Sequence, residues 1–276
     1  MSIWLKGVGG KISLDYVDLF ASDGKCELDA ELETPLRWDG SALLAVKMSK
    51  DYRNRWTCYL NELKSDVFAM LRDNLKTYEP WDGELFNEDA NVVIDKILSK
   101  INPDYPSLFF IDPQKHSDLP WKTIDKIANH VGYENRRPEM IINLMTTGMQ
   151  RNLDKAPESI SLALGMSEDA WRKIIETEYK SGKTYHEAFR DIYCAKLFQI
   201  YGINPVYLSV ENKKESTVFY LIAISSRDLG NKILSSLTKC VEGYKKDRWS
   251  KELSDIEIQI DVAKMKKGGQ RFISEY

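Results

Sequence analysis

The sequence predicts an α/β fold in which a mostly parallel β-sheet has helices on both faces and ends in an antiparallel hairpin. Three observations predict it. Strand-like and helix-like segments alternate between residues 14 and 145. Residues 107–111 (SLFFI) form a strand-like run with no polar face, as strands of a parallel sheet do. Residues 206–210 and 217–224 are strand-like and are joined by a polar turn, as in a hairpin.

Hydrophobic periodicity and turn residues define the individual elements. Polar residues end each predicted strand, and after most of these turns apolar residues recur at helical spacing. Strands are expected at residues 14–20, 56–60, 84–86, 107–111 and 139–145, before the two strands of the hairpin. Helices are expected at residues 42–48, 67–75, 93–101, 121–131, 168–180, 186–201 and 231–244. Gly182 and Gly202 are expected to end the helices that precede them.

The whole chain, residues 1–276, is expected to form one domain. Its length and its 43% hydrophobic content are sufficient for a substantial core without a disulfide or a metal. Two segments depart from the strand–helix alternation. Residues 150–183 are expected to be a helical insertion or cap, and residues 245–276 a charged C-terminal extension.

The composition excludes several classes of protein. A formal net charge of −3 argues against a protein that binds a nucleic acid duplex over its whole surface, although a local basic patch stays open. The four cysteines lie far apart and form no CxxC pair, so neither a zinc site nor a disulfide scaffold is indicated. Residues 1–6 have too little apolar content for a signal peptide, so none is expected, and the longest apolar runs are far too short for a bilayer. We therefore expect a cytoplasmic protein that does not bind a membrane.

Acidic residues follow four of the predicted strands at the point where each strand ends. The first is Asp18, in the segment that leads to Gly24, and the others are Glu62, Asp89 and Asp112. In an open parallel sheet, ligands bind beyond the carboxyl ends of the strands. Each acid taken alone has a simpler interpretation as the N-cap of the next helix. Acids at four strand ends together favour one shared binding site.

This series of acids suits S-adenosylmethionine (SAM), a methyl donor with a cationic sulfonium, a ribose diol and an adenine. A tight first turn with small residues, here Ala21 and Gly24, lets the backbone approach the amino-acid end of the donor. Glu62 can accept both ribose hydroxyls, and Asp89 can accept the exocyclic amine of adenine. Asp112 is then expected to face the reacting methyl group.

Three blocks of residues between positions 14 and 150 resemble a known family. They are YVDLFA at residues 16–21, Gly40-Ser41 before an apolar helix, and FIDP at residues 110–113 followed by Trp121. In this order and spacing they resemble the three-Cys-motif partner proteins, which are SAM-methyltransferase-like proteins encoded beside a protein with three clustered cysteines. More distantly, the blocks are similar to the bacterial 23S rRNA adenine-N6 methyltransferases. The resemblance implies a Rossmann-like class I methyltransferase fold and a three-cysteine-motif protein as a partner.

The sequence departs from the family's pattern at two motifs. The first turn, which usually reads Phe-Ala-Gly-Pro-Gly, is FASDG at residues 20–24, so Asp23 either repels the donor's carboxylate or accepts from its amino group. The adenine-N6 enzymes end their fourth strand in Asp-Pro-Pro-Tyr, and the aromatic ring stacks on a flipped base. Residues 112–115 read DPQK, without an aromatic residue. Base stacking must therefore come from elsewhere, or the acceptor is not a base.

The leading hypothesis is a SAM-dependent methyltransferase that needs no metal. By the resemblance alone, its acceptor is expected to be a nucleic acid base amine. The residues expected to act on the acceptor are Asp112, Pro113 and Gln114. The residues expected to bind SAM are Asp18, Ala21, Asp23, Gly24, Ser41, Glu62, Asp89 and Ala90.

Two other functions stay open at this point. The altered motifs also fit a SAM-binding or degenerate methyltransferase-like module that serves a three-cysteine-motif protein. A nicotinamide-dependent enzyme is disfavoured because no GxGxxG follows the first strand. Two side chains near the fourth-strand motif have a structural and a functional interpretation. His116 is expected to be a plain loop histidine, with a substrate-side role open. Trp121 is expected to pack under the fourth-strand loop, with a place in the lining of the substrate pocket as the alternative.

Overall fold

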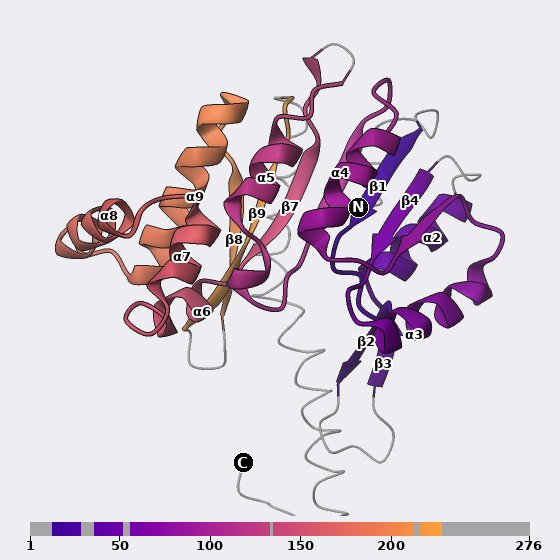
Figure 1. Ribbon diagram of the computed structural model, residues 1–276, viewed down its shortest axis with the longest axis horizontal. Helices are drawn as coiled ribbons and strands as arrows, with labels where there is room; N and C mark the ends of the chain where they lie inside the picture. The colour runs from indigo at the N-terminus through magenta and orange to yellow at the C-terminus, as the bar shows by residue number, and fades with distance from the viewer. Residues whose placement is uncertain (1–12, 29–35, 52–55, 133–134, 212–215, 228–276) are drawn as a thin grey trace, which may run out of the picture.

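The centre of the molecule is a seven-stranded sheet in the order β5-β4-β1-β6-β7-β9-β8 (Figure 1). The computed structural model describes residues 13–28, 36–51, 56–132, 135–211 and 216–227. The strands are β1 (Leu14–Asp18), β4 (Trp56–Asn61), β5 (Gly83–Phe86), β6 (Ser107–Ile111), β7 (Glu139–Leu144), β8 (Val206–Glu211) and β9 (Thr217–Ile224). The pairs from β5 to β7 are parallel, whereas β9 runs antiparallel to both β7 and β8. This arrangement confirms the predicted parallel sheet and terminal hairpin.

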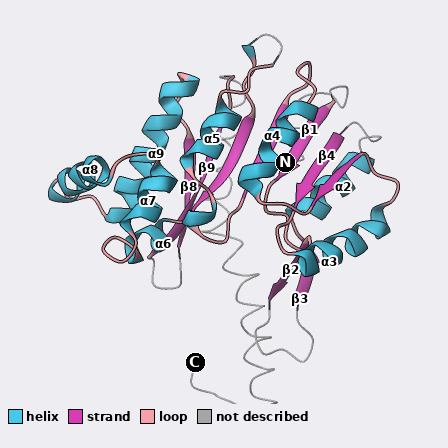
Figure 2. Cartoon of the chain, in the orientation of Figure 1, coloured by secondary structure: helices cyan, strands magenta, loops and turns pink. Residues whose placement is uncertain are grey.

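Helices connect the parallel strands and cover the sheet (Figure 2). They are α2 (Ser41–Asp51), α3 (Ser65–Leu75), α4 (Ala90–Lys100), α5 (Trp121–Ala128), α6 (Thr146–Arg151), α7 (Pro157–Leu164), α8 (Glu168–Lys180) and α9 (Tyr185–Tyr201). The longest, α9, has a capping box at its start, in which Thr184 and Glu187 satisfy each other's backbone N–H groups. It ends at Gly202, which takes the left-handed conformation (φ 69°), as the sequence predicts. None of the described helices is both long enough and apolar enough to cross a bilayer.

The two faces of the sheet carry two separate hydrophobic clusters. Side chains alternate between faces along each strand, so Val17 enters one cluster and its neighbour Tyr16 the other. The cluster around Val17 is formed with α4 to α9, and the cluster around Tyr16 with α2 and α3. Both residues are fully buried. The sheet is therefore covered by helices on both faces, as the sequence predicts.

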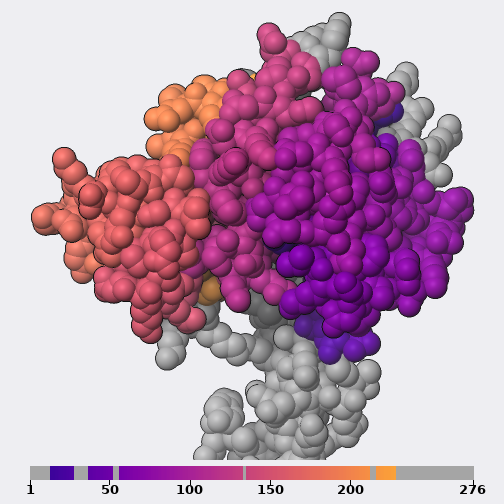
Figure 3. All heavy atoms as spheres, viewed as in Figure 1, coloured from indigo at the N-terminus to yellow at the C-terminus, as the bar shows by residue number. Residues whose placement is uncertain are grey.

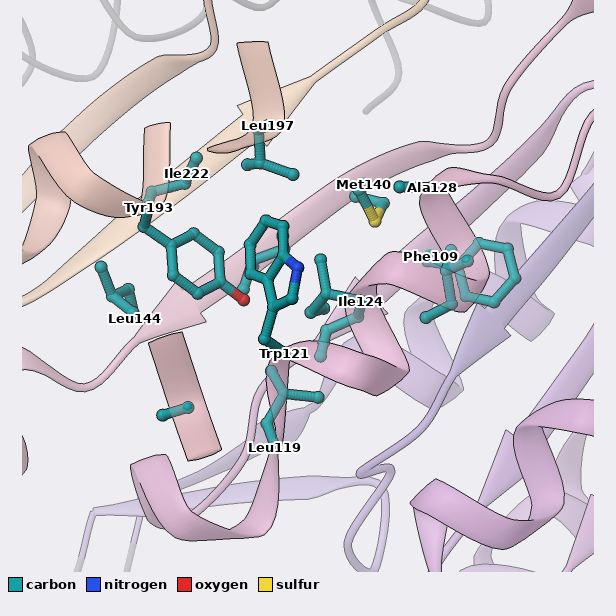
Figure 4. Close-up of a cluster of buried hydrophobic side chains, with 14 of the residues drawn as sticks. Phe109, Leu119, Trp121, Ile124, Ala128, Met140, Leu144, Tyr193, Leu197 and Ile222 are labelled. Carbon is teal, nitrogen blue, oxygen red and sulfur yellow. The ribbon is translucent and has the colours of Figure 1, made fainter. Parts of the chain in front are cut away.

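The larger cluster joins the helices after β7 to the rest of the molecule. Trp121, at the start of α5, meets the ring of Tyr193 from α9 edge to face, with 5.0 Å between ring centroids (Figure 4). Lys196 Nζ lies 4.2 Å from the centre of the Trp121 ring, at a distance typical of a cation–π contact. In Figure 3 the surfaces of α7–α9 and of the β1–α4 region lie on opposite sides of α5. Trp121 is thus a packing residue, as the sequence predicts.

The structure differs from the expectations in two places. A second sheet of two antiparallel strands, β2 (Lys25–Leu28) and β3 (Leu36–Asp39), lies between β1 and α2, and the sequence analysis does not foresee it. Four residues in each strand are too few for a clear alternation of polar and apolar side chains. Residues 150–183 contain the last two residues of α6 and two further helices, where one helix is expected. The predicted helix at 231–244 and the predicted extension at 245–276 lie outside the described residues.

Candidate active site

A cavity of about 710 Å³ lies beyond the carboxyl ends of the parallel strands. From β5 to β7 the sheet has the strand order of a doubly wound fold, and this order reverses between the parallel neighbours β1 and β6. Ligands of such folds bind at this reversal. Residues from the ends of β1, β4, β6 and β7 line the cavity, together with the start of α4 and the beginning of β9. They are Leu19, Phe20, Ser22, Asn61, Glu62, Leu63, Lys64, Asp89, Ala90, Asn91, Asp112, Pro113, Gln114, Lys115, Ser117, Asp118, Asn143, Met145, Val218 and Phe219.

The predicted acids after the second and third parallel strands both line the cavity. Glu62 is half-buried, and its Oε1 accepts a hydrogen bond from the backbone N–H of Lys64 (2.8 Å). Asp89 is exposed and is the N-cap of α4, because its Oδ1 accepts from the N–H of Asn91 (2.7 Å). Capping and ligand binding do not exclude each other here, since a carboxylate has more than one acceptor site. Ala90 lies beside Asp89 in the cavity wall.

The turn after β1 contributes Ser22 to the cavity. Ser22 has a positive φ of 53°, and the turn ends at Gly24 with a φ of 76°. A Cβ atom on Gly24 would lie 2.9 Å from Leu43 Cγ, so glycine is required there by both conformation and space. The Asp23 carboxylate accepts from the N–H of Lys25 (2.9 Å), and neither Asp23 nor Gly24 is among the residues that line the cavity. Ala21 is buried beneath the same turn.

Asp18 lies behind this turn, fully buried, and does not line the cavity. The Ser41 hydroxyl donates to Asp18 Oδ2 (2.6 Å), and the N–H of Phe20 donates to Asp18 Oδ1 (3.2 Å). Burial raises the pKa of Asp18 to about 6, although these hydrogen bonds lower it. Asp18 and Ser41 thus connect the end of β1 to the start of α2. Their predicted role in SAM binding stays a prediction.

The fourth-strand motif occupies the other end of the cavity. Asp112, Pro113 and Gln114 all line it, and Asp112 and Gln114 are exposed. The side chain of Asn143, at the end of β7, donates from Nδ2 to Asp112 Oδ1 at 2.6 Å. Among the described residues, one oxygen of Asp112 therefore has a hydrogen-bond partner, and the other oxygen is free to bind a ligand.

Asn61, which the sequence analysis misses, joins two chain segments at the end of the cavity that contains Glu62 and Asp89. It is the last residue of β4 and is 1% exposed. Its Nδ2 donates to the carbonyls of Leu19 (3.1 Å) and Glu88 (3.1 Å), and its Oδ1 accepts from the N–H of Glu88 (3.3 Å). One buried amide thereby connects the segments that follow β1 and β5. A polar residue at the end of an apolar strand is the signal that could have identified it.

The sequence analysis also misses the apolar wall of the cavity, which consists of Met145, Val218 and Phe219. Met145 follows β7, and Val218 and Phe219 belong to the antiparallel strand β9. Phe219 is half-buried. Its position in the cavity depends on the pairing of β7 with β9, which brings together residues more than seventy positions apart. No local pattern in the sequence could have placed this ring beside the Asp112 motif.

His116 lies behind the motif rather than in the cavity. It is 6% exposed, and its Nε2 is 2.9 Å from the hydroxyl oxygen of Ser159 on α7. Burial lowers the pKa of His116, so the neutral imidazole is favoured. His116 therefore packs and orients the loop, in agreement with the plain interpretation of a loop histidine.

The comparisons with known proteins find similar solved structures. No family model and no curated protein sequence matches the chain. Protein LPL1258 from Legionella pneumophila is 14% identical, with 86% of this chain and 87% of that chain covered and a TM-score of 0.49. A precorrin-6y C5,15-methyltransferase from Geobacter metallireducens is 12% identical over 81% of this chain and 85% of that chain, with a TM-score of 0.37. An rRNA methylase from Streptococcus thermophilus is 10% identical over 78% of this chain and 87% of that chain, with a TM-score of 0.35.

The chain has the Rossmann-like fold of the class I methyltransferases. The strand order carries this assignment, because β9 enters antiparallel between β7 and β8 at the edge of an otherwise parallel sheet. Such low identities and TM-scores carry no argument about activity. Function must be argued from the cavity itself.

Proposed function

We propose that the chain is a SAM-dependent methyltransferase. The observation that carries the proposal is the cavity, in which Glu62 and Asp89 stand at one end and Asp112 at the other. Its volume of about 710 Å³ is typical of sites for ligands of this size. Acidic residues outnumber lysines in its lining, which suits a donor with a cationic sulfonium and a cationic ammonium group.

Three of the residues predicted to bind the donor, Glu62, Asp89 and Ala90, line the cavity and support the proposal. Glu62 supplies a carboxylate for the ribose hydroxyls, and Asp89 supplies one for the exocyclic amine of adenine. The Ser22 turn lies next to Glu62 in the lining, where it can meet the amino-acid end of the donor. Asp18 and Ser41 would act from behind by fixing the path of the chain at this turn.

When bound, SAM supplies an electrophilic methyl group on sulfur. The chain then has to position an acceptor and remove water from it, which accounts for most of the catalysis in such a transfer. The unbound oxygen of Asp112 can accept a hydrogen bond from an acceptor amine and direct the nitrogen lone pair. The same carboxylate can take the proton that the methylated amine releases.

The acceptor that we propose is the amine of a nucleic acid base. The motif at residues 112–115 has no aromatic residue, but Phe219 lines the cavity and offers a ring on which a planar base can stack. Lys64 and Lys115 are exposed and also line the cavity, where they can contact a phosphate backbone. A flipped or single-stranded base would enter between them.

Calorimetric titration with SAM and with S-adenosylhomocysteine tests the donor site. We expect micromolar binding of both ligands, weakened at least about tenfold by Glu62→Gln because a charge-assisted hydrogen bond to ribose is lost. Glu176→Gln is the control, since Glu176 is exposed on α8 and lies outside the cavity lining. Wild-type protein that binds neither ligand would contradict the proposal.

The alternative is a methyltransferase-like module that serves a three-cysteine-motif protein. Its support is the sequence resemblance and the altered first turn. Failure of the titration in the protein alone, followed by SAM binding in the presence of such a partner, would favour this alternative.

A further inference from the structure

Asn143 is a polar residue in a strand that is otherwise apolar from Met140 onward. It belongs to β7 and is 9% exposed. Its neighbours Ile142 and Leu144 are buried in the larger hydrophobic cluster, and its backbone pairs with Leu221 of β9. The backbone at Asn143 is therefore held within the sheet.

The orientation of the Asn143 amide is determined by its contact with Asp112. At 2.6 Å only the NH₂ end can face a carboxylate, because two oxygens at that distance would repel each other. We propose that Asn143 is a positioning residue, whose amide holds one oxygen of Asp112 so that the other faces the acceptor. This inference rests on the proposed function, since it assigns Asn143 to the acceptor half of the same cavity.

The opposite end of the amide supports a fixed orientation. Asn143 Oδ1 is buried and has no hydrogen-bond partner among the described residues, and the same holds for the Tyr193 hydroxyl. Both residues border a second, small cavity of about 10 Å³, which is also lined by Pro113 and His116. That volume is about the size of a single water molecule. A water bound to both groups would tie the amide to α9 and thus to the core.

A buried side-chain carbonyl without a hydrogen-bond partner lowers the stability of the fold. An amide at this position therefore needs a reason other than stability. An apolar residue would fill the end of β7 without that cost, as Ile142 and Leu144 do one position away. The amide donates its hydrogen bond to the carboxylate of Asp112 at the cavity. Because this carboxylate is exposed, it does not need the hydrogen bond to compensate for burial. The geometry therefore points to a role in orienting Asp112.

Several titratable groups surround the Asn143–Asp112 pair, from each element packed near it. They are Asp18 on β1, Cys26 on β2, Glu62 and Lys64 after β4, Asp89 before α4, Lys115, His116 and Asp118 after β6, and Tyr193 on α9. Wild type and variants have these groups in common. A pH effect found only in a variant at position 143 therefore belongs to the pair.

Asn143→Asp is the most informative variant. Two carboxyl groups at such a short distance cannot both ionise at neutral pH, so the pair keeps one proton and a hydrogen bond replaces the amide contact. As pH rises, that proton is lost and the contact breaks. We expect methyl transfer from tritiated SAM to a single-stranded oligonucleotide of all four bases to approach wild type near pH 6. It should fall on the order of 100-fold relative to wild type as the pair ionises.

Asn143→Ala and Gln199→Glu complete the series. The alanine variant should lose on the order of 100-fold in kcat at every pH while binding SAM normally. Gln199 is exposed on α9, so Gln199→Glu adds a charge without touching the cavity and should leave the pH profile unchanged. Full kcat in Asn143→Ala, or equal loss in both Asn143 variants at all pH values, would overturn the inference.

Failure of this inference can be distinguished from failure of the proposed function. Carboxyl ¹³C NMR of Asn143→Asp needs neither SAM nor an acceptor. Compared with the wild-type spectrum, in which Asp15 and Asp18 already titrate near pH 6, it should show one additional carboxyl group that titrates well above pH 5. Two carboxyls that both titrate near pH 4 would show that the contact does not form, whatever the activity. Wild-type protein that does not bind SAM would instead overturn the proposed function.

Discussion

The two ends of the cavity are built in different ways. The donor end comes from residues 19–91, in which each segment follows its own parallel strand, and the buried amide of Asn61 cross-links these segments by three hydrogen bonds. The acceptor end comes from residues 112–219 and brings a loop, the end of β7 and the antiparallel strand β9 together. There the hydrogen bond between Asn143 and Asp112 joins the end of β7 to the loop after β6.

This difference indicates that the two ends of the cavity serve different ligands. A site for a fixed ligand benefits from several rigid contacts along one stretch of chain, because each strand end places one group. A site for a variable acceptor can be altered through the helices and the hairpin that surround it, without change to the donor end. We therefore expect substitutions at the two ends to separate binding of SAM from transfer of the methyl group.

The largest expected effect is at the acceptor end. Asp112→Ala should lower kcat for methyl transfer on the order of 1000-fold, because the group that orients and deprotonates the acceptor is lost. SAM binding, measured by calorimetry, should stay within about threefold of wild type, since Glu62 and Asp89 hold the donor. A variant that loses SAM binding as well would show that the two ends are not separate.

At the donor end, Asn61→Ala should lower the free energy of unfolding by about 3 kcal/mol, because buried backbone groups of Leu19 and Glu88 lose their partners. Urea denaturation measures this loss. Asn74→Ala is the matched control, since the half-buried Asn74 makes one hydrogen bond, to the Asp23 carbonyl, and should cost about 1 kcal/mol. Equal losses in both variants would contradict the cross-linking role of Asn61.

The buried carboxyl behind the first turn should make stability depend on pH. The pKa of Asp18 is about 6 in the folded protein and 3.8 as its ordinary value, so the folded state binds more protons between these values. Its contribution to stability is present below pH 4 and is lost as pH rises through 6, on the order of 3 kcal/mol. Denaturation at several pH values should show a smaller fall in Asp18→Asn than in wild type. The exposed Asp104→Asn should leave the fall unchanged.

The smallest effect is expected at the apolar wall. Phe219→Ala should raise KM for a base-containing acceptor by about tenfold, because a stacking surface is lost, and should leave SAM binding unchanged. Steady-state kinetics with the oligonucleotide measures it. Phe198→Ala on α9 removes an exposed ring outside the cavity lining and should have no effect. An unchanged KM in Phe219→Ala would exclude stacking on this ring.

Sequence reasoning finds cavity residues that follow parallel strands better than cavity residues that depend on strand pairing, and the reason is topological. Glu62 and Asp89 follow their strands directly, so the alternation of strands and helices places them at one edge of the sheet. Asn143 is visible in the sequence as a polar residue in an apolar strand, but its partner Asp112 is on a different strand. Phe219 requires the order of the hairpin strands, which no local pattern contains.

Packing also limits what the first turn reveals. Asp18 and Asp23 look like ligands from their position after β1, yet one is buried against Ser41 and the other closes a turn on Lys25. A short polar residue at the end of a strand can either bind a ligand or make a structural hydrogen bond, and the sequence does not distinguish the two. Only the direction of its side chain separates them, and that direction depends on α2 and on the β2–β3 hairpin.

A crystal structure of the protein with S-adenosylhomocysteine tests the central claim most directly, since it shows both ends of the cavity at once. We expect the ribose at Glu62, the adenine at Asp89, and the sulfur turned toward Asp112, with the Asn143–Asp112 bond intact. A ligand bound elsewhere, or bound with its sulfur away from Asp112, would contradict the assignment of the donor and acceptor ends.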